Sequence, residues 1–336
     1  MSSGARSQDE GVFPVLRAAA IPQETEANRW LIEELWGASA VGIIGGNPKT
    51  CKSWLALEMA VSISTGSKCL GRYQARERGA VLLYLAEDAL PVIRARVESI
   101  AKHHGAELEA LDLYFITTAS MRLDLPGDQE RLRKTIQTLR PKLVVLDPLV
   151  RLHRLDENSA NEVSGLLSYL RDLQREHQVA LAVVHHTRKN TTVGAQAGQG
   201  LRGSGDFHAW SDSSLYLRRV RDELSLTVEH RSASAPKPMG LRLVTQQDGA
   251  AHLECTAELG ATETQGASLR ERLLGALGDD LDVTRSALRD KLAVKNERLG
   301  NALSELEKEG LIQRTREGWR RNGESEPPSG VPCSLP

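Results

Sequence analysis

Aromatic residues are scarce in this chain of 336 residues, because phenylalanine, tyrosine and tryptophan together make up only 4%. A platform that stacks nucleic-acid bases on aromatic rings is therefore not expected. Net charge is also nearly absent, at −1. Since the chain as a whole is not a polycation, any nucleic-acid contact must be local, on a loop, a hairpin or a channel built by several subunits.

Cysteines are few, and none of the four has the paired spacing of a zinc site: Cys51, Cys69, Cys255 and Cys333. This usage is typical of a protein from the reducing cytosol. No run of eighteen apolar residues occurs, and the first residues lack the pattern of a secretory signal. The sequence therefore predicts a cytoplasmic protein without a membrane partner.

Short apolar runs alternate with helical segments over residues 26–256. We expect strands at 41–45, 80–86, 113–117, 143–146 and 179–184, and helices at 52–64, 90–104, 128–139 and 159–177. Continuous apolar strands between helices are typical of a parallel sheet that is covered on both faces. Four closely spaced strand-like runs follow, at 214–220, 224–229, 241–245 and 252–255. Their short connections favour antiparallel pairing at the sheet edge, so the expected fold class is α/β with a mostly parallel sheet and antiparallel edge strands.

The last part of the chain predicts a second, smaller domain. Residues 257–267 are polar and are expected to form a linker to a unit at 268–321. Three helical segments and a short basic hairpin are predicted there, with Thr284 as the cap of the second helix. That order is the plan of a winged helix, a variant of the helix-turn-helix. Residues 1–25 and 322–336 are expected to be flexible and disordered tails.

A glycine-containing loop lies between the first expected strand and the first expected helix. From Gly46 it matches G-x-x-x-x-G-K-[ST], except that Cys51 replaces the last glycine. Backbone N–H groups at a helix N-terminus bind phosphate, Lys52 would reach the β- and γ-phosphates, and Ser53 would bind Mg²⁺. A chance Lys-Ser after a turn is the alternative, which the strand–loop–helix order disfavours. The residues expected to bind ATP are Gly45, Gly46, Asn47, Pro48, Lys49, Thr50, Cys51, Lys52, Ser53 and Trp54.

Within this loop, Pro48-Lys49 and the helix start Trp54-Leu55-Ala56-Leu57 resemble a known family. They are similar to the plasmid RepA-type hexameric helicases and their RecA-like relatives, which include DnaB-type helicase domains. The resemblance covers about residues 30–235. It implies a RecA-like P-loop ATPase domain over residues 26–256, with ATP and Mg²⁺ as cofactors. It also implies a homo-hexameric ring that holds single-stranded DNA in its channel.

The resemblance assigns roles to residues at the ends of the strands. Glu87 matches the catalytic glutamate that activates water, although a solvated or helix-capping acid is the alternative. Asp147 matches a Walker-B-like ligand of the Mg²⁺ shell, against the alternative of a turn aspartate before proline. His185 and His186 match a sensor of the γ-phosphate, and their adjacent places on a strand argue against a shared metal. Asp88 is expected to cap the next helix.

An arginine finger from a neighbouring subunit is also implied, and Arg231 and Arg202 are the candidates. Arg218 and Arg219 are expected to be surface charges. Arg202 belongs to the glycine-rich segment 187–205. In RecA-like rings this segment faces the channel, so here it would follow the DNA backbone or be a solvated linker.

Two functions from different classes remain open on the sequence. The first is an ATP-dependent DNA motor resembling RepA-type helicases, in the replication of a plasmid, phage or mobile element. The alternative is an ATP-binding regulator, a replication or transcription switch with little turnover, which Cys51 favours. A recombinase-type filament is a third possibility.

The second domain could bind duplex DNA or another protein. Residues 268–321 hold twelve basic and ten acidic residues, so the domain is only mildly basic. The candidates for DNA contact are Lys295, Asn296, Arg298, Asn301, Arg314, Arg316, Arg320 and Arg321.

Overall fold

The computed structural model divides the chain into two compact units, a larger one that ends at Thr256 and a smaller one that begins at Ala257. None of the helices in the described part of the chain has the length and apolar character needed to span a bilayer. The described residues are 13, 15–21, 23, 25–157, 159–186, 206–220, 223–246, 249–258, 269–277, 282–292, 294 and 296–322.

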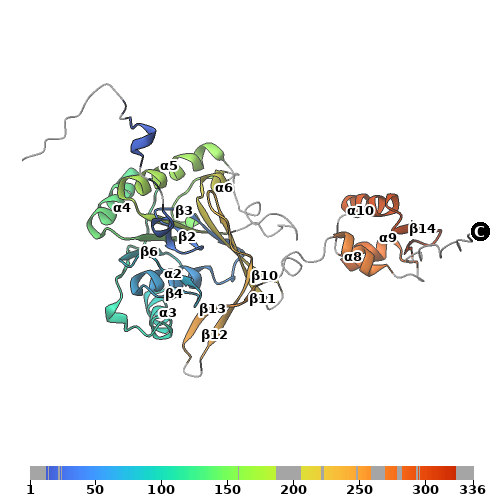
Figure 1. Cartoon of the computed structure of the whole chain (residues 1–336), viewed down its shortest axis with the longest axis horizontal. Helices are drawn as coiled ribbons and strands as arrows, with labels where there is room; N and C mark the ends of the chain where they lie inside the picture. Colours follow the sequence, from blue (N-terminus) through green and yellow to red (C-terminus); the bar gives the residue numbers. More distant parts are fainter. Residues whose placement is uncertain are drawn as a thin grey trace, which may run out of the picture. The chain divides into compact units, whose positions relative to one another are not determined.

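A sheet of nine strands forms the centre of the larger unit, in the order β13-β12-β11-β10-β3-β9-β8-β6-β7 (Figure 1). The six strands from β10 to β7 run parallel to one another. Every residue of β3 and β8 is buried, which explains the uninterrupted apolar runs in their sequences. The bounds of the parallel strands are β3 Val41–Gly46, β6 Val81–Leu85, β7 Leu113–Phe115, β8 Leu143–Asp147, β9 Ala180–His186 and β10 Ser213–Val220.

Antiparallel strands extend this sheet, as expected. They are β11 (Glu223–His230), β12 (Met239–Thr245) and β13 (Ala251–Glu258). β11 pairs antiparallel with β10 and with β12. All nine expected strands of the sheet are present, with ends that differ by no more than three residues. β9 runs to His186 rather than 184 because its last residues still pair with the end of β3, and β13 continues two residues into the expected linker.

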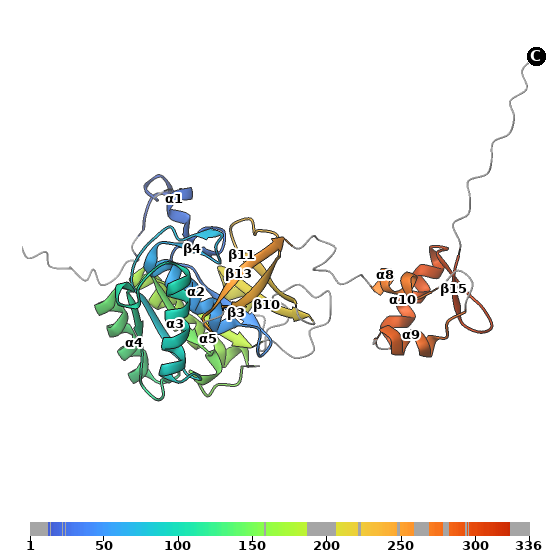
Figure 2. The same cartoon turned by 90° about the horizontal axis from the view of Figure 1, so that it is seen from below.

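Helices cover both faces of the sheet. α2 (Lys52–Thr65) and α3 (Leu90–His103) lie on one face, and α4 (Pro126–Leu139) and α5 (Ala160–His177) lie on the other (Figures 1 and 2). α2 is buried on nearly all sides, and even its Glu58 is inaccessible to solvent. This helix therefore lacks the amphipathic pattern of a surface helix. Its apolar side chains belong to the main hydrophobic core.

Several short elements were not expected from the sequence, because two to five residues are too few for a readable period. In one of them Trp36 is completely buried and its indole Nε1 donates to Ala40 O at 3.3 Å. These elements are β1 Trp30–Ile32, β2 Trp36–Gly37, β4 Lys68–Cys69, β5 Tyr73–Gln74, α1 Glu26–Arg29, α6 Asp206–Trp210, and the 3₁₀ turns η1 Ala18–Ala20, η2 Leu108–Ala110 and η3 Leu149–Arg151.

The smaller unit contains three helices followed by a two-stranded hairpin, in the expected order. Thr284 Oγ1 accepts from Ala287 N at 3.2 Å, which confirms it as the cap of the second helix. Leucines of all three helices form one buried cluster, with Ile312 of the hairpin. The bounds are α8 Leu269–Ala276, α9 Arg285–Leu292, α10 Asn296–Lys308, β14 Ile312–Arg314 and β15 Trp319–Arg321.

Close contact between β3 and β10 makes glycine necessary at position 42. A Cβ on Gly42 would lie 1.6 Å from Ser213 O, a backbone atom that cannot move without separating the strands. We therefore predict that Gly42→Ala lowers the free energy of unfolding by about 3 kcal/mol or more. Gly165→Ala is the control, since a Cβ there meets nothing within 4 Å and alanine favours the helix. Equal melting temperatures for the two variants would contradict this prediction.

Candidate functional site

The loop after β3 doubles back to begin α2, and two of its residues, Lys49 and Cys51, have left-handed backbones with φ of 64° and 62°. Gly46 is required by close approach, because a Cβ there would lie 2.5 Å from Leu217 O. Inside the loop, Thr50 Oγ1 donates to Asn47 O at 2.8 Å. The chain thus curls tightly at the N-terminus of a buried helix, where free N–H groups attract anions.

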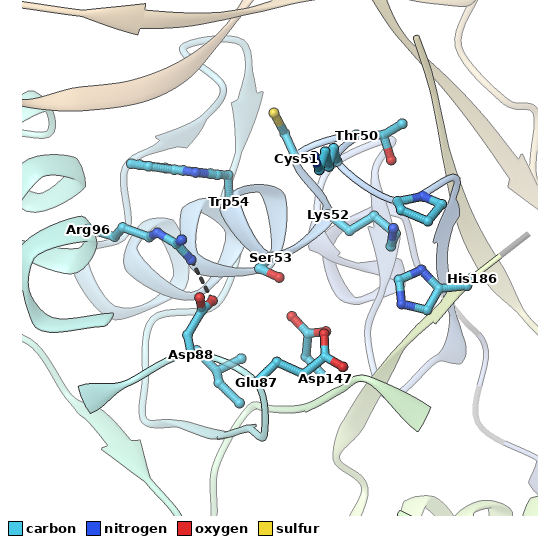
Figure 3. A pocket seen from close by; sticks show the side chains of 13 residues that line it. Thr50, Cys51, Lys52, Ser53, Trp54, Glu87, Asp88, Arg96, Asp147 and His186 are labelled. Atoms are coloured by element: carbon cyan, nitrogen blue, oxygen red, sulfur yellow. Dashed lines mark hydrogen bonds and ion pairs between the residues drawn. The ribbon is translucent and has the colours of Figure 1, made fainter. Parts of the chain in front are cut away.

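Cys51 stands where the sequence pattern expects glycine, and its backbone explains that expectation. Its φ of 62° and ψ of 26° are those of the left-handed region, which costs a non-glycine residue about 1 kcal/mol. Figure 3 shows its thiol pointing away from Glu87 and Asp147. Arg219 Nη2 lies 3.6 Å from the sulfur, so this arginine, expected to be a simple surface charge, borders the loop. The cysteine therefore fits without obstructing the acidic side of the site.

Lys52 is buried and turns its ammonium into the loop. Nζ donates to Asn47 O at 2.8 Å and to Gly46 O at 3.1 Å. Burial lowers the pKa of Lys52, while the nearby carboxylates of Asp147 and Glu87 act in the opposite direction. An ammonium held by carbonyl groups alone is incompletely neutralised, so an anion at the loop would be bound strongly.

Asp147 is the buried acid of the site, at the end of β8. Burial raises its pKa from 3.8 to about 6, although a hydrogen bond with Ser53 and the charge of Lys52 oppose the rise. Burial thus disfavours the charged form of this carboxyl, and a cation beside it would stabilise that form. This position is beside the end of β6, because Leu85 pairs with Asp147 across the two strands.

Glu87 and Asp88 follow β6 and face the same cavity. Glu87 Oε1 lies 3.2 Å from Arg151 Nε, and both side chains are about half exposed. The sequence predicted that Asp88 caps α3, and this prediction is wrong, because the N-cap of α3 is Ala89. Asp88 Oδ2 instead pairs with Arg96 Nη1 at 2.5 Å, since Arg96 lies about two turns along α3 and its side chain extends back toward the start of the helix. Arg96 also lies over the Trp54 ring, 5.4 Å from its centroid. Figure 3 shows this group at one side of the pocket.

The two histidines at the end of β9 point to opposite faces of the sheet, as alternation along a strand requires. His186 lines the cavity with Lys52 and Asp147. His185 is buried on the other face, where its ring centroid is 4.9 Å from that of Phe207 and its Nδ1 is 3.9 Å from Glu157 Oε1. Of the two, only His186 is placed to contact a ligand of this cavity.

Of the two arginine candidates, Arg231 lies away from this cavity. Arg231 follows β11 beside Asp212, at the end of the sheet opposite the loop, and its Nη1 is 3.2 Å from Asp212 Oδ1. Nη2 also donates to Ala209 O. Arg231 therefore does not belong to the site of its own chain. Arg202 and the segment 187–205 lie outside the described residues.

One cavity of about 420 Å³ brings most of the expected residues together at the carboxyl ends of the parallel strands. The sequence did not single out Arg96 and Leu85, because a helix arginine and a strand leucine carry no motif. The residues that line the cavity are Pro48, Lys49, Thr50, Cys51, Lys52, Ser53, Trp54, Leu85, Glu87, Asp88, Arg96, Asp147 and His186.

The donor set suits a nucleotide with Mg²⁺. Among the described residues no group of three or more His, Cys, Asp or Glu side chains could hold a metal alone. Ser53 and Asp147 both line the cavity and offer two oxygen ligands. Mg²⁺ commonly takes only one or two protein ligands and completes its shell with phosphate and water, so this pair fits it.

Comparisons with known proteins agree with this geometry. The family described as an AAA domain matches residues 7–192, more than half of the chain. No curated protein sequence matches. Among solved structures, one described as an ATPase domain is similar at 14% identity, with 66% of this chain and 86% of that chain covered and a TM-score of 0.51. A DnaB-like replicative helicase, described with its interactions with primase, is similar at 15% identity. The match covers 64% of this chain and 59% of that chain, with a TM-score of 0.50. At such identities the likeness is one of fold: the larger unit has the fold of RecA-like ATPases.

The left-handed backbone at Cys51 leads to a prediction about stability. Cys51→Gly should raise the free energy of unfolding by up to about 1 kcal/mol, because glycine adopts this conformation without strain. Cys51→Val should lower it by a similar amount or more, since a β-branched side chain is disfavoured there. Cys51→Ala is the control and should change little. Identical urea midpoints for the glycine and valine variants would show that the backbone does not limit this position.

The raised pKa of Asp147 leads to a prediction about pH in the metal-free protein. A carboxyl whose folded pKa is about 6 and unfolded pKa is 3.8 destabilises the fold above pH 6, and this penalty disappears as the pH falls toward 4. Asp147→Asn should therefore raise the free energy of unfolding by about 2 kcal/mol at pH 8 and much less at pH 4.5. Chemical unfolding in EDTA measures this, with the exposed Asp172→Asn as control. A pH-independent difference would contradict it.

Proposed function

The chain belongs to the AAA domain family, and we propose that it is an ATP-driven motor that moves along single-stranded DNA, like the RepA-type replicative helicases that its motifs resemble. The observation that supports this most is that one cavity is lined by Lys52, Glu87, Asp147 and His186. These side chains are the parts that hydrolysis of a nucleoside triphosphate needs. The structural neighbours described as an ATPase domain and a replicative helicase have the same fold.

Each residue would have a separate role in hydrolysis. Lys52 would exchange its bonds to loop carbonyls for bonds to the β- and γ-phosphates. Ser53 and Asp147 would hold Mg²⁺, which supplies charge neutralisation when bound. Glu87 would orient and deprotonate water after leaving Arg151, a half-exposed partner that binds it weakly. His186 would donate a hydrogen bond to the γ-phosphate.

We further propose that Arg231 completes the site of the neighbouring subunit in a ring. Arg231 is about half exposed and lies on the side of the sheet away from its own loop. Its bonds to Asp212 and to Ala209 O hold the guanidinium at that surface. A hexamer would place one such arginine beside each nucleotide, as in the DnaB-type helicases that the motifs resemble.

The smaller unit would be a winged helix, with α10 as the helix that enters the major groove and β14–β15 as the wing. Its three helices and hairpin occur in the order that this module requires. This assignment also supports the second candidate, a regulator that binds ATP and duplex DNA with little turnover. The strained Cys51 backbone in the nucleotide loop is the observation that favours it.

ATPase activity with and without single-stranded DNA separates the two candidates. We expect turnover that single-stranded DNA stimulates, and a loss of about 100-fold or more in Lys52→Ala and in Glu87→Gln. Lys68→Ala, on an exposed lysine of β4, is the charge-matched control and should keep full activity. Tight binding to duplex DNA without stimulated turnover would instead support the regulator.

Mixed oligomers test the role of Arg231. Lys52→Ala and Arg231→Ala should each be inactive alone, because one lacks the loop lysine and the other lacks the finger. An equal mixture should regain about a quarter of the wild-type rate, since a quarter of the interfaces then join an intact loop to an intact arginine. Arg242→Ala, on an exposed strand arginine paired with Glu254, should stay active alone. No recovery on mixing would exclude a finger at Arg231 that acts between subunits.

A further inference from the structure

The smaller unit contains a second polar cavity, which the ATPase chemistry does not use. It has a volume of about 450 Å³ and lies between the start of α9, one side of α10 and the β14–β15 hairpin. Three arginines line it: Arg285, Arg314 and Arg316. Two glutamates, Glu307 and Glu317, line it as well, so the lining has one net positive charge. Such a lining favours a singly charged anion over a neutral or cationic ligand.

Gly300 gives this cavity its shape. It lies inside α10, where glycine costs about 1 kcal/mol relative to alanine, so its presence requires another reason. A Cβ at Gly300 would lie 2.6 Å from Arg285 Nη2 and 3.5 Å from Arg285 Cζ. The guanidinium of Arg285 thus lies against the backbone of α10 in the space that a side chain would fill. The glycine thereby brings an arginine of α9 to the face of α10.

The hairpin presents the other two arginines. Arg314 lies over the Trp319 ring, with 5.9 Å from its Cζ to the ring centroid, and Arg316 is exposed in the turn between the strands. A different pair of contacts fixes the base of the hairpin, because Asp282 accepts from Thr315 Oγ1 at 2.7 Å and from Arg320 Nε at 3.0 Å. Arg320 is therefore a structural residue, and it does not line the cavity.

We propose that this cavity binds a backbone phosphate of duplex DNA through Arg285, Arg314 and Arg316. The inference rests on the proposed role of the smaller unit as a DNA-binding module and names the site of contact. A phosphodiester carries one negative charge, which matches the net charge of the lining, and guanidinium groups bind phosphate in a fork geometry. Asn301 and Ser304 of α10 line the same cavity, and amide and hydroxyl side chains are among those that bind base edges. A phosphate held here would therefore position α10 for contact with bases.

Binding of the full-length chain to a blunt duplex of mixed sequence, measured by fluorescence anisotropy without nucleotide, tests the proposal. Arg285→Ala and Arg316→Ala should each weaken binding about tenfold. Each should also lower the slope of log affinity against log salt by about one, since one phosphate contact is lost. Arg270→Ala is the matched control, because this exposed arginine of the same unit pairs with Glu309 and does not line the cavity. It should bind duplex DNA as the wild type does.

Gly300→Ala provides the sharper variant, because it changes no charge. The added methyl must displace the flexible end of Arg285, so duplex affinity should fall as in Arg285→Ala, while the melting temperature stays equal or rises. ATPase stimulation by single-stranded DNA should be unaffected in this variant.

Three outcomes would overturn the phosphate site. The first is that Gly300→Ala and Arg285→Ala both bind duplex DNA as tightly as the wild type does. The second is that the wild-type chain shows ATPase activity stimulated by single-stranded DNA but does not bind duplex DNA, which would leave the proposed motor intact. Binding of polyglutamate that these variants lose, without any loss of duplex binding, would identify the cavity as a site for an acidic protein instead.

Discussion

Two buried charges at the carboxyl edge of the sheet, the Lys52 ammonium and the Asp147 carboxylate, are the constraint on which the account depends. Lys52 is bonded only to carbonyl oxygens of its loop, and Asp147 has a pKa raised to about 6 by burial. Burying such groups is costly unless each gains a full partner. A phosphate beside the lysine and a divalent cation beside the aspartate would supply both partners at once. The two buried side chains are therefore arranged to bind a phosphate group together with a divalent cation.

The fold explains how these charges come to lie together. β9 lies between β3, which leads into the loop before α2, and β8, which ends at Asp147, so the loop, His186 and the acid share one edge. Parallel strands place all their following loops at that edge. Burial of α2 on nearly every side fixes the helix N-terminus against the sheet. The opposite edge carries Arg231 and Asp212, so Arg231 lies away from the cavity of its own chain.

Much of this arrangement could be predicted from the sequence. Apolar runs predicted the strands, and the motif at Gly46 to Ser53 predicted the loop, because both signals depend on local chemistry. The sequence did not reveal that His186, rather than His185, lines the cavity, since the choice depends on which strand face meets the loop. Nor did it show that Asp88 pairs with Arg96 across two helical turns, or that Arg285 lies over Gly300. These are tertiary contacts, and no local pattern encodes them.

Calorimetric titration of the full-length chain with Mg²⁺ and a non-hydrolysable ATP analogue tests the central claim most directly. The account predicts saturable binding of one nucleotide per chain. It also predicts a strong loss of affinity when Mg²⁺ is omitted, because Asp147 then lacks its cation, or when Lys52 is replaced by alanine, because the phosphates then lack their ammonium partner. Absence of binding at millimolar nucleotide, or equal binding by the wild type and the alanine variant, would contradict it.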